Sequence, residues 1–408
     1  MDETSRNKGT TMKVAHVAND DVALCYLLHH QLRILRQAGY EVVAISARGT
    51  DIQPLHEIGI RHIAVSFTRS MHTPHRDLQA LIQLVRIFRQ ESFTIVHTHN
   101  PKPGILGQIA AKIAGVPIIV NTLHGFYLHD RMSAPTRRFY IFLEKIAARC
   151  SDLILSQNRE DMDIAIHEGI CPPHKIKHLG NGIDLSQFNP ELFSISEVMR
   201  KRAEIGIPPQ AKVIGFVGRL AARRKGFVDF LRAGQKVVAR VPDAYLLVVG
   251  EPDWGKPDAV HPSIAQEYGL AGRCIYLGKR PNSELPLLYA LMDVLVLPSL
   301  FEGIPRVVME ASAMKVPVVA TDVKGNREAV QDGYNGILVP LGDVDQLSQA
   351  IISVITNAGK AKRMGEEGRR IALERFDEQI VFSKIREEYE RLLAEKGLLP
   401  QVTMEVAS

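Results

Sequence analysis

Cysteine is scarce in this 408-residue chain, and its four cysteines are widely spaced. No CxxC pair occurs among Cys25, Cys150, Cys171 and Cys274, so the sequence predicts neither a zinc knuckle nor a disulfide framework. No apolar run approaches the roughly 18–20 residues that cross a bilayer, and residues 1–11 lack an apolar signal core. These absences predict a protein of the reducing cytoplasm.

The charge imbalance is also small. Lys+Arg 50 against Asp+Glu 45 gives a net charge of +5, which is too mild to indicate a nucleic-acid partner. No GxGxxG follows an expected strand, which argues against a nicotinamide-dependent dehydrogenase. The chain length allows roughly two domains.

Short apolar runs alternate with longer amphipathic stretches along most of the chain. The first series of expected strands is 13–17, 41–46, 94–97, 116–120 and 153–155. The second series is 213–217, 245–249, 274–277, 294–297, 316–320 and 337–339. A helix is expected over 22–37, between the first two strands. Such alternation is typical of parallel sheets covered on both faces. It predicts an α/β protein with two Rossmann-like, doubly wound lobes facing a cleft.

A Gly/Pro-rich break separates the two series. The predicted divisions are a disordered tail over 1–11, a first lobe over 12–190, a second lobe over 191–375, a charged helix over 376–400 able to cross back to the first lobe, and a disordered tail over 401–408.

Segment 301–310 places two acids around the expected start of a buried helix. It follows strand 294–297, and Pro305 stands where a first-turn proline is tolerated. Backbone N–H groups at a helix start can bind an anion, while Glu302 and Glu310 can accept hydroxyl protons. A sugar joined to a nucleoside through a diphosphate offers this combination. The simpler alternative is a capping acid and a structural salt bridge.

Two cations follow strand 213–217 in the loop that ends at Gly226. Arg219 can bind a diphosphate through two parallel hydrogen bonds, and Lys225 adds a point charge. Alone, this loop is more simply interpreted as a basic surface. In one lobe with the two acids, it favours a phosphate-binding site.

In combination these motifs resemble glycosyltransferase family 4, a family of retaining nucleotide-sugar transferases with the two-lobed GT-B fold. The likeness covers roughly residues 12–395. It includes the strings 96–104, 121–125, 250–252 and 317–322. It implies that the first lobe lies on the acceptor side and that the second binds the nucleotide-sugar.

The resemblance also implies roles for individual residues. Arg219 and Lys225 would bind the donor diphosphate. Glu310 would bind the ribose hydroxyls, whereas Glu302 and His124 would contact the transferred sugar. The catalytic set is therefore Arg219, Lys225, Glu302 and His124. The substrate-binding set is Asn19, His99, Gly218, Arg224, Gly250, Glu251, Arg280, Gly303, Ile304, Pro305 and Glu310.

The chain departs from the family pattern in two places. The loop between Arg219 and Lys225 is one residue longer, so Arg224 could share or take the role of Lys225. Segment 19–21 (Asn-Asp-Asp) replaces a frequent glycine pair after the first strand, which leaves the role of Asn19 open.

Metal binding is the weaker interpretation of two patterns. His97, His99 and His124 could form a metal site, but neutral imidazoles at strand ends are more often held by backbone groups. The pairs in 161–163 and 343–345 imitate an acid–x–acid metal motif. Because both begin helical patterns, helix capping is the better interpretation, and we predict no metal.

The stretch 131–149 is basic and aromatic. Its residues include Arg131, Arg137, Arg138, Phe139, Tyr140, Phe142 and Lys145. It could lie on an anionic membrane surface. Alternatively, Phe139, Phe142 and Ile146 fit a buried stripe of an ordinary packed helix.

The resemblance implies a retaining, hexosyltransferase-type enzyme that acts on a glycan or lipid-linked acceptor in cell-surface polysaccharide synthesis. A UDP-sugar is favoured over a GDP-sugar as the donor, and neither a cofactor nor a nucleic-acid partner is expected. Peripheral contact with the cytoplasmic face of the inner membrane would occur through 131–149. Two alternatives stay open: a nucleotide-sugar epimerase or hydrolase of the same fold, and a non-catalytic GT-B-fold partner protein.

Overall fold

The computed structural model describes residues 12–49, 52–68, 73–99, 102–126 and 132–399. The tails predicted at 1–11 and 401–408 lie outside the described residues, as does Arg131.

The described residues form two compact units. Unit 1 contains the chain up to Leu179 together with residues from Phe382 onward, and unit 2 contains Gly180–Val381. The division falls earlier than the boundary predicted at residue 190. The C-terminal helix α14 (Glu378–Glu395) begins in unit 2 and contributes its later residues to unit 1.

Unit 1 is built on a seven-stranded parallel sheet of order β3-β2-β1-β4-β5-β6-β7. Its strands are β1 (Lys13–Val17), β2 (Glu41–Ser46), β3 (Arg61–Ala64), β4 (Ile95–His99), β5 (Ile118–Leu123), β6 (Leu153–Ser156) and β7 (Ile176–His178). Its helices are α1 (His29–Gln37), α2 (Gln53–Glu57), α3 (Pro74–Glu91), α4 (Lys102–Ala114), α5 (Ala134–Cys150) and α6 (Arg159–His167), with the later part of α14. A π-helical turn, η1 (Ala23–Leu27), precedes α1.

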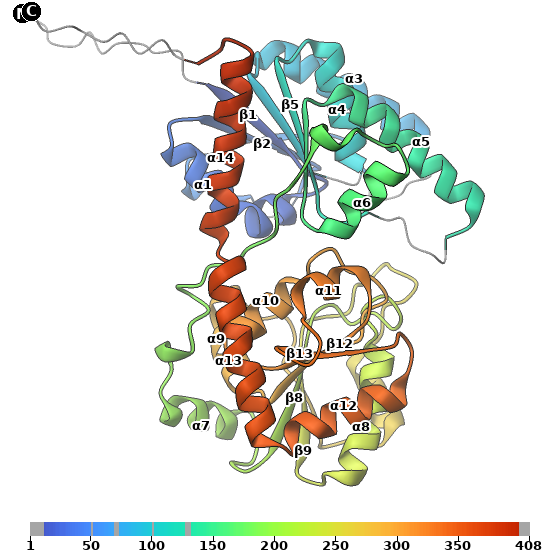
Figure 1. The fold of residues 1–408 in the computed structure, drawn as a ribbon, viewed down its shortest axis with the longest axis vertical. Coiled ribbons are helices and arrows are strands. Elements are labelled where there is room, and N and C mark those ends of the chain that lie inside the picture. Colours follow the sequence, from blue (N-terminus) through green and yellow to red (C-terminus); the bar gives the residue numbers. More distant parts are fainter. Residues whose placement is uncertain (1–11, 50–51, 69–72, 100–101, 127–131, 400–408) are drawn as a thin grey trace, which may run out of the picture. The chain divides into compact units, whose positions relative to one another are not determined.

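The two faces of this sheet are covered differently because side chains alternate along each strand. Ala15 of β1, Val96 of β4 and Ile119 of β5 point to the face where α3 and α4 pack. The residues between them, including His16 and His97, point to the opposite face, where α14 lies (Figure 1). The sheet therefore buries imidazoles beneath α14.

Unit 2 contains a six-stranded parallel sheet of order β10-β9-β8-β11-β12-β13. Its strands are β8 (Lys212–Val217), β9 (Ala244–Val249), β10 (Cys274–Tyr276), β11 (Val294–Leu297), β12 (Val318–Thr321) and β13 (Gly336–Val339). Its helices are α7 (Ile195–Glu204), α8 (Phe227–Arg240), α9 (Leu285–Ala290), α10 (Arg306–Ala313), α11 (Lys324–Ala329), α12 (Val344–Ile355) and α13 (Ala358–Arg375), with the start of α14.

The predicted fold class is confirmed, since both sheets are parallel and carry helices on both faces. The strands expected at 13–17, 41–46 and 294–297 have the observed bounds, and the others differ by one to three residues at an end. The single helix expected over 22–37 is divided into η1 and α1. The short strands β3 and β7 did not figure in the expected series.

Candidate active site

The predicted phosphate-binding residues of unit 2 meet at one edge of its sheet. Since all strands are parallel, the loops that follow β8, β9 and β11 emerge together. At two glycine positions on this edge, the packing of the backbone leaves no room for a side chain. A Cβ atom built on Gly250 would lie 1.9 Å from the Gly218 carbonyl oxygen, and one on Gly226 would lie 1.9 Å from that of Pro298. The glycines therefore let these loops approach closely.

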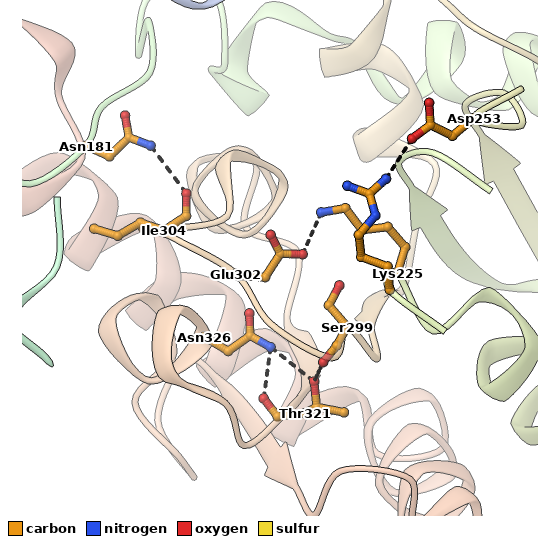
Figure 2. Close-up of polar contacts among 9 residues, drawn as sticks. Asn181, Lys225, Asp253, Ser299, Glu302, Ile304, Thr321 and Asn326 are labelled. Atoms are coloured by element: carbon orange, nitrogen blue, oxygen red, sulfur yellow. Dashed lines mark hydrogen bonds and ion pairs between the residues drawn. The ribbon is translucent and has the colours of Figure 1, made fainter. Parts of the chain in front are cut away.

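Lys225 and Glu302 form an ion pair at this edge. The Lys225 Nζ lies 2.6 Å from the Glu302 Oε1, and their side chains are only 20% and 10% exposed. Figure 2 shows the two side chains facing each other from the loops after β8 and β11. The backbone also joins these loops, since the Leu300 N–H donates to the Arg224 carbonyl over 3.1 Å. The long loop thus places Lys225, rather than Arg224, beside Glu302.

Asp253 is a site residue that sequence reasoning missed. One of its carboxylate oxygens, Oδ2, accepts hydrogen bonds from Arg219 Nη1 over 2.9 Å and from Arg224 Nη2 over 2.8 Å. The Asp253 side chain is 11% exposed, whereas that of Arg219 is half exposed. Two guanidinium groups therefore converge on a single anionic oxygen. Such convergence of an Arg pair on one oxygen also suits a phosphate.

Helix α10 begins one residue later than expected. Pro305 is its N-cap residue rather than a first-turn residue, and the Pro305 carbonyl accepts the Val308 N–H over 3.1 Å. The Ile304 carbonyl just before it accepts a hydrogen bond from Asn181 over 3.3 Å (Figure 2). A Cβ atom on Gly325 would lie 1.8 Å from the Gly303 carbonyl oxygen. This turn is thus held by close backbone contacts from several segments.

Glu310 is buried on α10 with two partners. The Tyr289 hydroxyl donates to its Oε2 over 2.8 Å, and Arg306 Nε lies 3.8 Å from its Oε1. Burial raises the pKa of Glu310, and the Arg306 charge and the Tyr289 hydroxyl partly oppose that rise. Sequence reasoning did not identify either partner. Tyr289 lies on α9, and only the fold brings it to α10.

We expect Tyr289→Phe to destabilise the protein by about 1.5–3 kcal/mol near neutral pH, because a buried carboxylate loses a hydroxyl donor. The pKa of Glu310 is higher in the folded protein than in the unfolded chain, so its ionisation opposes folding when the pH exceeds the pKa of the unfolded chain. Loss of the Tyr289 hydroxyl raises the pKa of Glu310 in the folded protein further. As the pH falls through the raised pKa, Glu310 protonates and the loss should shrink. Thermal melting at several pH values measures this trend.

Tyr245→Phe is the matched control. The Tyr245 ring lies against Arg273, and the tyrosine hydroxyl that bonds Glu310 is that of Tyr289. It should leave the melting temperature nearly unchanged at every pH. A loss for Tyr289→Phe that stays constant with pH would contradict an ionised Glu310 at neutral pH.

A second hydrogen-bond network supports the loop that carries Glu302. The Thr321 hydroxyl donates to the Ser299 carbonyl over 2.6 Å, and the Asn326 amide donates to the Thr321 carbonyl over 2.8 Å (Figure 2). All three residues are buried. Through these bonds the loop after β11 is tied to β12 and α11.

Glu251 and Arg280 follow β9 and β10 at the same sheet edge. Glu251 lies 3.9 Å from Lys279, and Arg280 lies 3.8 Å from Glu284. All four side chains are substantially exposed, so these pairs contribute little to stability. The substrate-binding role expected for Glu251 and Arg280 stays a prediction.

In unit 1 the predicted residues His99 and His124 lie together. His99 Nδ1 is 3.0 Å from His124 Nε2, and His99 Nε2 is 3.1 Å from Nδ1 of His16. Burial lowers the pKa of His124 to about 4 and that of His16 to about 3. These imidazoles are therefore neutral. Asn19 follows β1, and its carbonyl accepts the Ala47 N–H over 3.2 Å.

His97, His99 and His124 were the histidines considered as an alternative metal site, but the fold brings a different set together. Ring nitrogens of His16, His97 and His99 lie within 4.8 Å of one another, with His16 in the place expected for His124. Sequence reasoning missed His16 because it stands alone in β1. The expectation that backbone groups hold these rings is wrong, since side chains bond them. The absence of a metal stays a prediction.

The two acid–x–acid pairs differ in their roles. Asp343 caps α12 as expected, since its side chain accepts the Gln346 N–H. Asp161 is not a cap: Asn158 caps α6, and the buried Asp161 carboxylate accepts hydrogen bonds from Asn158 and from the Phe126 N–H. The Asp161 carboxylate thus joins α6 to the segment after β5.

The buried stripe suggested for α5 is wrong in part. Phe139 and Phe142 are 56% and 59% exposed, whereas Ile141 and Ala148 of the same helix are buried. Ile146 is partly buried. Arg138 is exposed beside the two phenylalanines, so α5 carries an aromatic and basic outer face. No helix within the described ranges combines the length and apolar character that crossing a bilayer requires.

Comparison with known proteins identifies matching families for both units. Residues 198–371 match the profile of the glycosyl transferases group 1, and residues 27–187 match that of Glycosyltransferase Family 4. The chain is 32% identical over 281 residues to the UDP-Gal:alpha-D-GlcNAc-diphosphoundecaprenol alpha-1,3-galactosyltransferase of Escherichia coli, covering 68% of this chain and 70% of that protein.

Two further proteins are similar over most of the chain. The capsular polysaccharide biosynthesis glycosyltransferase CapM of Staphylococcus aureus is 27% identical over 381 residues, covering 90% of this chain and 94% of that protein. The structure of Anabaena Alr3699/HepE in complex with UDP-glucose superposes with a TM-score of 0.78 at 23% identity, covering 93% of this chain and 100% of that one. This last similarity establishes the shared fold.

Proposed function

Since this chain belongs to glycosyltransferase family 4 and is a glycosyltransferase of the GT-B fold, we propose that it transfers a sugar from a nucleotide-diphosphate donor to a hydroxyl group. The observation that carries this proposal is that three cations and two acids lie on the loops and the helix at one sheet edge. Arg219, Arg224 and Lys225 supply the cations. Glu302 and Glu310 supply the acids.

The donor diphosphate is proposed to bind between Arg219 and Lys225. The Asp253 oxygen held by Arg219 and Arg224 supports this, because a phosphate oxygen could accept the same pair of charge-assisted bonds. The start of α10 would add backbone N–H donors. Glu310 would accept the ribose hydroxyl protons, as the family resemblance implies.

Catalysis would proceed with retention at the anomeric carbon and without a metal. The bond from that carbon to the diphosphate oxygen breaks, the acceptor oxygen bonds to the same face, and a leaving-group oxygen takes the acceptor proton. Arg219 and Lys225 would stabilise charge on the leaving diphosphate. The carboxylate of Glu302 would stabilise positive character on the sugar. Full activity in the presence of EDTA, with the α-anomeric product from an α-linked donor, is the expected result.

The names of two relatives support a proposal for the acceptor class. One is named for transfer to a GlcNAc-diphosphoundecaprenol, and another for capsular polysaccharide biosynthesis. We therefore propose that the acceptor of this chain is a lipid-linked glycan that serves polysaccharide synthesis. A UDP-sugar is the proposed donor, and the galactosyl donor UDP-Gal in the name of the first relative supports it.

A thermal-shift screen with UDP-, GDP- and ADP-sugars tests donor binding, since a ligand that binds the folded protein raises its melting temperature. The UDP-sugar should give the largest shift. Incubation with donor alone then separates the alternatives, because an epimerase or hydrolase would consume it without an acceptor. A non-catalytic partner protein would turn over no donor even with a lipid-linked acceptor, and that result would reject the proposed function.

The outer face of α5 is proposed to contact the membrane that holds this acceptor. Phe139 and Phe142 would enter the headgroup region, and Arg138 would meet anionic lipids. Replacing both phenylalanines by serine should reduce sedimentation with vesicles of phosphatidylglycerol, while the melting temperature and its rise on adding the UDP-sugar stay unchanged. Leu78→Ser is the matched control, since Leu78 is 58% exposed on α3. If the double phenylalanine variant sedimented with the vesicles as well as Leu78→Ser did, this membrane contact would be rejected.

A further inference from the structure

The segment after β9 lies against the loop after β8, because the pairing of these two parallel strands continues past their ends. The Leu220 N–H donates to the Glu251 carbonyl over 2.9 Å, and Leu220 forms a parallel bridge with Pro252. Arg219 directly precedes Leu220, and Asp253 directly follows Pro252. Strand register thus brings the side chains of Arg219 and Asp253 within reach of each other.

The same segment contacts the loop after β8 a second time. The Ala222 N–H donates to the Asp258 carbonyl over 2.7 Å, and the Asp258 side chain accepts the Arg224 N–H over 3.2 Å. We call residues 252–260 the brace. Hydrogen bonds to the loop after β8 hold both of its ends, whereas residues 254–257 between them are exposed. The position of the brace on this loop is therefore fixed by its backbone.

The brace places the Asp253 carboxylate between two guanidinium groups. Its Oδ2 accepts from Arg219 Nη1 over 2.9 Å and from Arg224 Nη2 over 2.8 Å. Two nitrogens that share one acceptor atom lie close together, and their like charges repel each other. The carboxylate offsets this repulsion. Without it, we expect the half-exposed Arg219 side chain to turn toward solvent.

The bonds to Asp253 leave both arginines able to bind a phosphate. A guanidinium has five N–H donors, and each of these two gives one of them to Asp253. A ligand can reach Arg219, since half of its side chain is exposed. A guanidinium that a carboxylate already orients loses less conformational freedom when a ligand binds. The bond to Asp253 therefore favours diphosphate binding by the same arginines.

We propose that Asp253 is a positioning residue that holds Arg219 and Arg224 side by side, so that both bind the donor diphosphate. This inference rests on the proposed function, which places the diphosphate at these cations. Asp253 acts through the two arginines and does not touch the donor. It also separates the role of Arg224 from that of Lys225, which pairs with Glu302 instead.

Asp253→Asn is the direct test, because asparagine keeps the size and one acceptor oxygen and removes the negative charge. Relaxation measurements on protein labelled with ¹⁵N-arginine report how ordered the Nε–H groups of Arg219 and Arg224 are. Their two signals are assigned by their loss in Arg219→Ala and in Arg224→Ala. Both groups should be ordered in the wild type, and that of Arg219 should become mobile in Asp253→Asn.

Titration calorimetry with UDP measures the consequence for binding. The dissociation constant should rise about tenfold in Asp253→Asn, the factor that corresponds to one hydrogen bond to a charged group. Loss of a negative charge beside the diphosphate would by itself tighten binding, so a weaker affinity identifies the lost order of the arginines. In a protein that also carries Arg219→Ala and Arg224→Ala, Asp253→Asn should no longer weaken UDP binding.

Asp243→Asn is the matched control. It makes the same substitution at an exposed aspartate directly before β9, at the opposite end of that strand from Asp253. The arginine signals and the UDP affinity should both stay as in the wild type. Asp253→Glu keeps the charge on a longer side chain and should fall between the wild type and Asp253→Asn in both measurements.

The possible outcomes separate this inference from the proposed function. Unchanged arginine signals in Asp253→Asn overturn the inference. A tighter UDP affinity also overturns it, since the carboxylate would then compete with the diphosphate. So does an equal loss of affinity with and without the two arginines, which would show that Asp253 does not act through them. The spectra require no donor, so a wild type that binds no nucleotide would reject the proposed function while the holding of both arginines stands.

Discussion

Replacing Arg219 by alanine should lower kcat by about 10²–10³-fold, the effect of removing one preorganised group that stabilises developing charge. Arg219 lies at the sheet edge where Lys225 and the start of α10 also meet, and its guanidinium already binds a carboxylate oxygen. The donor KM should rise as well, because Arg219 would also contact the ground-state diphosphate. Steady-state kinetics with the UDP-sugar found in the thermal screen measure both effects.

The fold should survive this substitution. The Arg219 side chain is half exposed, and its removal leaves Asp253 paired with Arg224, so the melting temperature should change little. Arg223→Ala is the matched control, because Arg223 is exposed in the same loop and its side chain takes no part in the ion pairs described for Arg219, Arg224 and Lys225. Near-wild-type activity in Arg219→Ala would show that Arg219 does not bind the donor diphosphate.

Glu302→Gln should also lower kcat by about 10²–10³-fold, but with a different kinetic signature. Glutamine keeps the shape and an acceptor oxygen for Lys225, and it removes the negative charge that would stabilise positive character on the sugar. Because that charge matters mainly in the transition state, kcat should fall with little change in donor KM. Single-turnover kinetics would show whether the chemical step is the one that slows.

Stability provides the control for this variant. The Lys225–Glu302 pair is mostly buried, so the loss of its charge should cost about 1 kcal/mol and lower the melting temperature by about 2–4 °C. Glu267→Gln, at an exposed acid of the same unit, should change neither activity nor stability. If Glu302→Gln raised the donor KM and left kcat intact, Glu302 would be a ground-state binding residue instead.

Local sequence predicted the strands well because both faces of each sheet are buried, so the strands read as apolar runs such as 294–297. Helix boundaries were harder. Nothing local separates η1 from α1 within 22–37, and Pro305 stands one position before α10 instead of inside it. For α5, periodicity indicated an apolar stripe, but packing selected Ile141 and Ala148 for burial and left the phenylalanines outside.

The acids and cations of unit 2 were also recognisable in sequence, because their spacing around a strand end and a helix start is local. Their partners were not. Asp253 reaches Arg219 and Arg224 only because β9 lies beside β8, and Tyr289 reaches Glu310 only because α9 packs near α10. The choice between Arg224 and Lys225 likewise depended on the path of the loop after β8.

By itself, the sequence determined the two α/β series and the chemical groups at the ends of their strands, since apolar patterning and motif spacing act over a few residues. Tertiary structure alone decided which charges pair and which imidazoles meet. Those contacts depend on the order of parallel strands and on α14 covering β1 and β4, and such long-range packing is not encoded in any single segment.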